Sequence, residues 1–238
     1  MSANNPADET TNANSAVQIV PTGLGSTLVG NDYRVRYDVW MNVNGPLPAG
    51  GGGSTEAFMV AVGWNGGNPI EIGTENGTYL TITGEGGSST DVRTFTNDGF
   101  NILGINAGPS NNTADEYYHG IFPGGIDVSA LPVQGGVDEQ SGVTSPGQMA
   151  FAWHDIRVDV VGDSVSFYVD DLLIASDPDA DRTGSIALGY GDYFSSESDA
   201  PQWSFGLVDN LRVETIPEPS TVTFLAGFLA CGLLRRRR

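Results

Sequence analysis

The sequence WHDIRVDVVGDSVSFYVDDLLIAS, residues 153–176, alternates apolar and polar side chains in three short runs. The pairs Gly162-Asp163 and Asp170-Asp171 separate these runs. A period of two is typical of strands with one buried and one exposed face, and two-residue turns of this composition join antiparallel neighbours. The stretch therefore predicts an antiparallel meander of three strands, the first of which starts near Met149.

The same alternation recurs on both sides of the meander. Tyr33 to Met41 places Tyr, Val and Met on one face and Arg, Asp and Trp on the other. Further strands are expected at Phe58–Trp64, Tyr79–Thr83, Val92–Phe95, Ser185–Tyr190 and Phe205–Glu214. Outside the C-terminal tail, no amphipathic helix pattern exceeds three turns. We therefore predict an all-β fold, an antiparallel jelly-roll sandwich over residues 16–214, after a disordered N-terminus at residues 1–15.

The tail at residues 215–238 combines three different pieces in a fixed order. Pro217-Glu218-Pro219 interrupts regular structure, an uncharged apolar run extends from Thr221 to Leu234, and the chain ends in Arg235, Arg236, Arg237 and Arg238. The apolar run predicts one short C-terminal hydrophobic helix, whose span of roughly 22 Å is less than the roughly 30 Å of a bilayer core. By the positive-inside rule the arginines stay cytoplasmic, and the rest of the chain lies outside the cytoplasm.

These three pieces resemble the PEP-CTERM sorting signal of Gram-negative bacteria that produce exopolysaccharide. The resemblance implies that an exosortase, a membrane transpeptidase-like enzyme, recognises Pro217, Glu218 and Pro219. It also implies export to the cell surface or extracellular matrix, with the tail in the inner membrane before processing. The chain would then be a substrate of that machinery.

The composition narrows the choice of partner. The formal net charge is −19, the sequence contains no lysine, and four of its ten basic residues are the terminal arginines, which leaves six in the body. Nucleic-acid binding needs phosphate-neutralising cations, so this class of partner is excluded. The single cysteine, Cys231, lies in the tail, so the body has no internal disulfide. Because residues 1–12 lack a basic and apolar leader pattern, we expect that the natural start lies upstream.

The second half of the body is similar to a known superfamily. Trp153-His154, Val165 to Asp171, Ser185 to Gly189 and Phe205 to Val213 resemble motifs of the laminin-G, or concanavalin A-like lectin/glucanase, superfamily. The resemblance implies a two-sheet jelly roll, and it implies that Trp153-His154 opens a core strand. Members of this superfamily include lectins, adhesion modules and glycosidases, so the fold alone leaves the function open.

Glycosidic cleavage requires two carboxyl groups that face the scissile bond. The superfamily's glucanases present Glu-x-Asp-x-x-Glu on one strand, and the nearest pattern here is Glu197-Ser198-Asp199-Ala200-Pro201-Gln202. It contains a proline and ends in Gln, so we expect no catalytic residues and no enzyme activity.

A calcium site is the candidate for a metal. Asp177, Asp179 and Asp181 offer carboxylates at alternate positions, and oxygen donors of this kind suit Ca²⁺. The resemblance to laminin-G-like domains implies that calcium can lie on the loop rim, where Asp170, Asp171 or Asp192 would be further ligands. The alternative is a solvated acidic turn.

We therefore expect an exported, exosortase-sorted protein that binds carbohydrate or associates with the exopolysaccharide matrix without catalysis. A glycoside hydrolase of the same superfamily and a purely structural surface protein are the alternatives. We expect the ligand surface among the long loops of residues 97–148, since such loops are often functional. Aromatic residues that are candidates for stacking on sugar rings, with core packing as the alternative for each, are Trp64, Tyr117, Tyr118, Tyr193 and Trp203.

Overall fold

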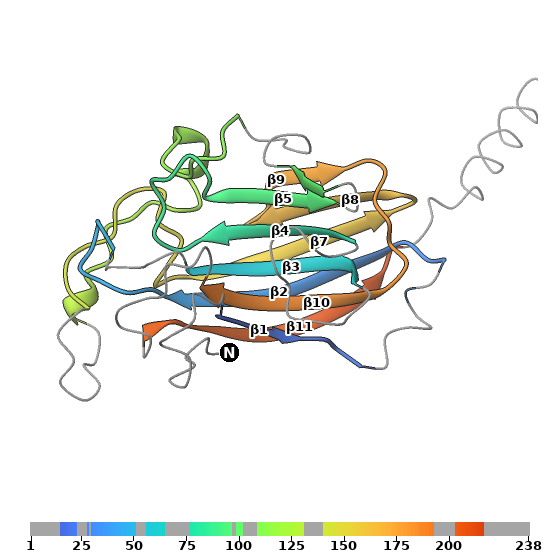
Figure 1. Cartoon of the computed structure of the whole chain (residues 1–238), viewed down its shortest axis with the longest axis horizontal. Helices are drawn as coiled ribbons and strands as arrows, with labels where there is room; N and C mark the ends of the chain where they lie inside the picture. The colour runs from blue at the N-terminus through green and yellow to red at the C-terminus, as the bar shows by residue number, and fades with distance from the viewer. Residues whose placement is uncertain are drawn as a thin grey trace, which may run out of the picture.

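The structure is a computed structural model of the chain. It describes residues 15–22, 28, 30–50, 56–64, 77–96, 99–101, 109–130, 140–192 and 203–216. Two antiparallel sheets lie face to face (Figure 1). The all-β sandwich predicted from the sequence is confirmed.

One sheet has five strands in the order β11-β2-β7-β8-β9. Its strands are β2 (Tyr33–Asn42), β7 (Trp153–Val161), β8 (Ser164–Val169), β9 (Leu172–Asp177) and β11 (Phe205–Thr215). The predicted meander is its β7-β8-β9 half. Asp170 and Asp171 have φ of 48° and 63°, and positive φ at both turn residues is what a type I′ hairpin requires.

The other sheet has six strands in the order β1-β10-β3-β4-β5-β6. Its strands are β1 (Ser15–Ile19), β3 (Glu56–Trp64), β4 (Thr78–Thr83), β5 (Val92–Thr96), β6 (Gly99–Asn101) and β10 (Ser185–Asp192). β1 was missed by the sequence analysis, which ended the disordered N-terminus at Ser15. It pairs along its whole length with β10, from Ser15 opposite Asp192 to Ile19 opposite Leu188.

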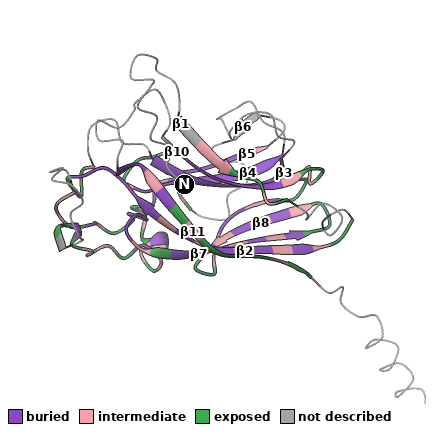
Figure 2. Ribbon diagram, turned by 90° about the horizontal axis from the view of Figure 1, so that it is seen from below, coloured by how far each residue is buried: buried purple, intermediate pink, exposed green. Residues whose placement is uncertain are grey.

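The core lies between the two sheets (Figure 2). On β2 the burial alternates strictly as far as Met41, so that its Tyr and Val side chains are buried and its Arg, Asp and Trp side chains face outward. The inward set includes Tyr33, Val35 and Tyr37, each at most 2% exposed, and Phe58 and Val60 of β3 belong to the same core. Burying each such side chain contributes about 1.5–3 kcal/mol, so the sandwich is stabilised by its core without a disulfide.

Residues 109–130 and 140–150 close one end of the sandwich, at the left in Figure 1. They contain two short 3-10 helices, η1 (Glu116–Tyr118) and η2 (Val128–Ala130). Asp115 begins η1 by accepting a hydrogen bond from the Tyr117 N–H at 3.0 Å. Tyr118 and Phe122 point inward and are 1% exposed. The described part of these loops therefore extends the core.

The sequence predictions for the tail lie outside the described residues, which end at residue 216. These predictions are the hydrophobic helix, the Pro217-Glu218-Pro219 motif and the four terminal arginines. Among the residues that are described, no helix is long and apolar enough to cross a membrane.

Candidate functional site: an aromatic row on the five-stranded sheet

The outer face of the five-stranded sheet carries a row of large apolar side chains. Strand register places Leu207 of β11 opposite Trp40 of β2, and Trp40 opposite Trp153 of β7. Directly paired residues point to the same face of a sheet, so the three side chains are neighbours. Trp153 is 52% exposed and Leu207 is 44% exposed, whereas Trp40 is half-buried.

Two further rings fix the orientation of Trp40. Phe151 contacts it edge-on, with ring centroids 5.9 Å apart, and Phe205 lies at 5.7 Å with the ring planes tilted by 38°. The Phe151 N–H donates to the carbonyl of Met41 at 2.9 Å, and this residue has φ of 69°, which is rare for a bulky side chain. We call Trp40, Phe151, Trp153, Phe205 and Leu207 the aromatic row. The Trp40 ring is therefore held by Phe151 and Phe205 before any ligand arrives.

An acidic row runs beside the aromatic row, one step along the same face. Asp209 is opposite Asp38, and Asp38 is opposite Asp155. Like charges placed directly opposite destabilise a sheet. The Asn210 side-chain amide donates to Asp38 at 2.6 Å, and Arg36 Nε donates to both oxygens of Asp155, at 2.8 and 2.6 Å, which offsets part of this cost.

Beyond the acidic row, four arginines are held by carboxylates. Arg34 donates from Nε and Nη2 to Asp159 at 2.6 and 2.8 Å, and this bond raises the pKa of the Arg34 guanidinium. Arg157 contacts Asp171 at 2.6 Å, and its guanidinium carbon lies 3.9 Å from the centroid of the Tyr168 ring. Arg36 and Arg212 complete the set.

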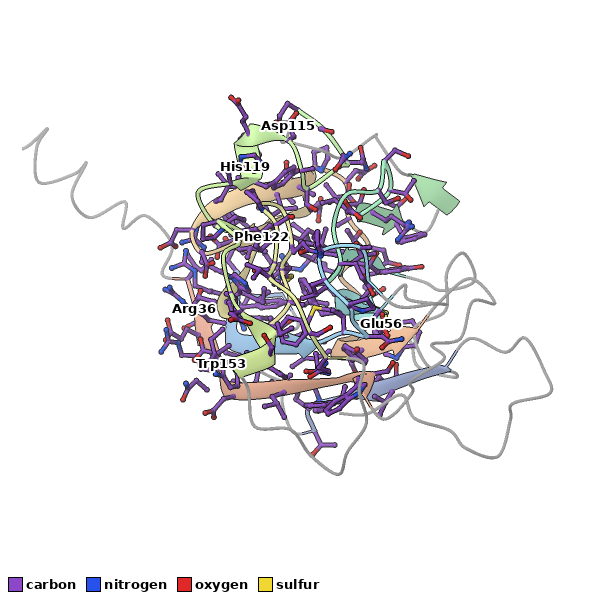
Figure 3. The ribbon with its side chains drawn as sticks, turned by 90° about the vertical axis from the view of Figure 1, so that its left-hand side faces the viewer. Arg36, Glu56, Asp115, His119, Phe122 and Trp153 are labelled. Carbon is purple, nitrogen blue, oxygen red and sulfur yellow. The ribbon has the colours of Figure 1, made fainter. Side chains whose placement is uncertain are left out.

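Taken together, the outer face offers an apolar aromatic surface beside a line of hydrogen-bond acceptors. Sugar rings have an apolar C–H face that packs on indole rings, and their hydroxyl groups donate to carboxylates. Trp153 and Arg36 lie on one side of the molecule and Glu56 on the other (Figure 3).

Glu56 belongs to a buried acid pair in the six-stranded sheet. Glu85 accepts a hydrogen bond from the Glu56 N–H at 3.1 Å, and Glu56 accepts one from the Ser204 hydroxyl at 2.8 Å. Glu85 as a whole is half-buried, but its carboxyl group is enclosed. Burial, and next the neighbouring Glu56 carboxyl, raise the pKa of Glu85 well above its usual value. Glu56 is fully buried, so a glycosidic bond cannot reach between the two carboxyl groups.

The three aspartates of the predicted calcium site have different environments. Asp177 is 5% exposed and accepts from the Thr78 hydroxyl at 2.7 Å, whereas Asp181 accepts from the backbone N–H of Thr183 at 2.9 Å. Asp179 is exposed. Among the described residues, no three His, Cys, Asp or Glu side chains gather as a metal cluster would require. The calcium site stays a prediction from sequence.

His154 is a structural residue, as the sequence analysis favoured. It is 4% exposed, and its Nδ1 and Nε2 lie 2.6 Å from the Asp170 carboxylate and 3.0 Å from the Met149 carbonyl. Phe122 contacts the ring edge-on at 5.1 Å. These contacts tie the start of β7 to the β8–β9 turn.

The aromatic residues that the sequence analysis proposed for stacking are placed differently. Trp64, Tyr118 and Trp203 are at most 8% exposed, and Tyr117 donates its hydroxyl to the Leu173 carbonyl at 2.7 Å. These residues pack inside the protein. The remaining candidate, Tyr193, and the motif of residues 197–202 lie outside the described residues.

Trp153 was missed as an exposed ring, because the resemblance assigned it to the opening of a core strand. The signal in the sequence was Trp40, which alternates with the apolar residues of its strand and shares a face with Arg34, Arg36 and Asp38. An aromatic residue on a charged face is a candidate for ligand contact.

The fold and the aromatic row define a class of molecule: a two-layer β-sandwich with a rigid aromatic surface that faces solvent. No family model matches the sequence, and no curated protein matches it. Among solved structures, a carbohydrate-binding module from Bacillus subtilis is similar, with a TM-score of 0.39 and 12% identity over 84% of this chain and 81% of that chain.

Two other solved structures show similarity at the same level. The carbohydrate recognition domain of Emp47p has a TM-score of 0.39 and 12% identity over 85% of this chain and 79% of that chain. The kappa-carrageenase of Pseudoalteromonas carrageenovora has a TM-score of 0.32 and 12% identity over 78% of this chain and 64% of that chain. At these values no residue role and no ligand passes from those proteins to this chain.

Proposed function

We propose that the chain is a non-catalytic module that binds carbohydrate through the aromatic row. The observation that carries this proposal is the pairing of Trp40 with the 52% exposed Trp153 on one sheet face. The fold leaves the apolar surface of an exposed indole ring in contact with water. A ligand with a flat apolar face removes this surface from water when it covers the ring, which favours binding. The neighbouring acidic row supplies acceptors for the hydroxyl groups at the edge of a sugar ring.

Two buried carboxyl groups with a raised pKa lie away from the aromatic row. A glycosidase needs one protonated carboxylic acid beside the scissile bond. Burial is the largest cause that raises the pKa of Glu85 and of Asp91. Glu85 contacts Glu56 in the six-stranded sheet, and Asp91 is 1% exposed and accepts from Thr83 at 2.7 Å. Neither lies on the face of the aromatic row.

Binding is tested by affinity electrophoresis of the protein through gels that contain a panel of polysaccharides. Trp153→Ala is expected to weaken binding at least about 30-fold, since truncating a central aromatic contact typically costs about 2 kcal/mol or more. Val161→Ala is the matched control, because Val161 is 49% exposed at the other end of the same strand. Equal affinities of the two variants would refute the role of the row. Binding to no polysaccharide would leave a structural surface protein.

The proposal includes export and sorting through the tail, with an exosortase as partner and the cell surface or extracellular matrix as destination. It is supported by the order of Pro217-Glu218-Pro219, the apolar run and the terminal arginines. Fractionation of cells that carry an exosortase tests it. Replacing Pro217, Glu218 and Pro219 by alanine should retain the protein in the inner membrane. Unchanged release would contradict the sorting role.

A further inference from the structure

All six arginines of the body already have partners, and the sequence contains no lysine. On the five-stranded sheet, Arg34 is held by Asp159, Arg36 by Asp155 and Arg157 by Asp171, each at 2.6 Å. Charge-assisted hydrogen bonds between a guanidinium and a carboxylate are shorter and stronger than neutral ones. The guanidinium groups nearest to the aromatic row are therefore already neutralised by carboxylates.

The three other body arginines are partnered as well. Arg182 lies 3.6 Å from Asp32 and donates to backbone carbonyls, and Arg93 of β5, in the other sheet, donates to the Thr90 hydroxyl at 2.8 Å. Arg212 lies 3.6 Å from Glu214, and both side chains are more than half exposed. An exposed ion pair of this kind is weak, because water screens the two charges from each other. Arg212 is therefore held less strongly than the other arginines of this face.

The charge nearest to the aromatic row is negative. Asp38 and Asp209 lie one step from Trp40 along the strands and have no arginine partner among the ion pairs of the described residues, whereas Asp155 in the same row is neutralised by Arg36; the basic residues lie one step further away. A sulfate or carboxylate group on a sugar that stacks on Trp153 would meet the acidic row before any cation. At low ionic strength this arrangement repels a polyanion, and the net charge of −19 adds to the repulsion.

We infer that the aromatic row takes uncharged glycans and discriminates against sulfated or carboxylated ones. The inference rests on the proposed function and names the substrate class of the same surface. Hydroxyl groups are donors as well as acceptors, so a neutral sugar can donate to the carboxylates of the acidic row. A carboxylated or sulfated ring carries acceptors there and leaves the facing carboxylates without a donor, which is the kind of mismatch that gives specificity.

The test compares each neutral polymer with an anionic derivative of the same polymer. The full chain is run through gels that contain a neutral glucan, mannan or galactan, and in parallel through gels with the carboxymethyl or sulfate derivative of each. The buffer is 20 mM in salt, and the runs are repeated at 300 mM. We expect the derivative of the best neutral ligand to bind at least about 10-fold more weakly at low salt, with part of the difference lost at high salt.

Two single-residue variants distinguish an effect of charge on the affinity from an effect of the shape of the surface. Asp209→Asn keeps the size and one acceptor oxygen and removes a charge beside the row, so the ratio of neutral to anionic affinity should fall. Glu116→Gln is the control, since Glu116 is an exposed carboxylate of η1 outside the five-stranded sheet, and the ratio should not change. Stronger retention by the anionic derivative at low salt, lost in Trp153→Ala, would overturn the inference and leave the proposed function standing. Retention by no polymer would overturn both.

Discussion

The buried acid pair predicts an unusual dependence of stability on pH. Because burial and the Glu56 carboxyl raise the pKa of Glu85 well above 4.5, the folded protein keeps a proton that the unfolded chain has already lost. In that pH range the folded state binds one proton more, so the free energy of unfolding falls as pH rises. The slope for one proton is about 1.4 kcal/mol per pH unit. The stabilisation that comes from the retained proton is complete below pH 4.5, and it is lost as pH rises through the pKa of Glu85 in the folded state.

Glu85→Gln isolates this effect. The amide has the shape of the protonated acid and donates to Glu56 at every pH, so the variant should lack the slope. Urea unfolding followed by circular dichroism between pH 4.5 and 9 gives the free energy of unfolding of each protein. The variant minus wild-type difference should rise with pH, by about 1.4 kcal/mol per unit, until it levels off. Glu116→Gln, the same change at an exposed position, should give a flat difference. A flat difference for Glu85→Gln would refute the shared proton.

Three further predictions concern the framework. His154→Ala should lower the free energy of unfolding by about 3 kcal/mol in urea titrations, because the buried Met149 carbonyl loses its hydrogen-bond donor and the removed ring leaves a cavity beside Phe122. Gly63→Ala should cost at least about 3 kcal/mol, measured in the same way, because the residue has φ of 75° and a Cβ there would overlap the backbone oxygen of Asp181; a smaller loss would show that the two segments are not in contact. Asp177→Asn should lower the melting temperature measured in chelator, because the Asp177 carboxylate accepts a hydrogen bond from the Thr78 hydroxyl, and an unchanged melting temperature would contradict this. A calcium-dependent rise in the melting temperature of the wild type that the variant lacks would establish the predicted metal site.

The fold class could be predicted because the alternation of apolar and polar residues is visible within each of the long strands that form the core. β2 and β7 each alternate over nine residues, and a one-residue slip would expose their buried valines, so the sequence specifies both faces. β1 could not be predicted, since Ser15–Ile19 is short and is defined by its pairing with β10, far away in the sequence. Local pattern carries no information about such a partner.

The candidate site could be predicted only in part, for a similar reason. Alternation placed Trp40 on an outer face, but the register that puts Trp153 beside it joins residues more than one hundred positions apart. Trp64 and Trp203 were candidates for stacking on sugar rings with core packing as the alternative, and both are buried. Exposure of a single aromatic residue depends on tertiary packing, which composition does not reveal.

The role of the aromatic row is tested most directly through the four indole N–H groups of the chain, at Trp40, Trp64, Trp153 and Trp203. Each gives one signal in a nitrogen–proton correlation spectrum, and single Trp→Phe variants assign them. The protein is titrated with a soluble neutral oligosaccharide of the best-binding polymer. The Trp153 signal, with that of Trp40, should shift in proportion to occupancy, while the buried Trp64 and Trp203 signals stay in place. Saturable binding that leaves the Trp153 and Trp40 signals unmoved would contradict the assignment of the ligand surface to this face.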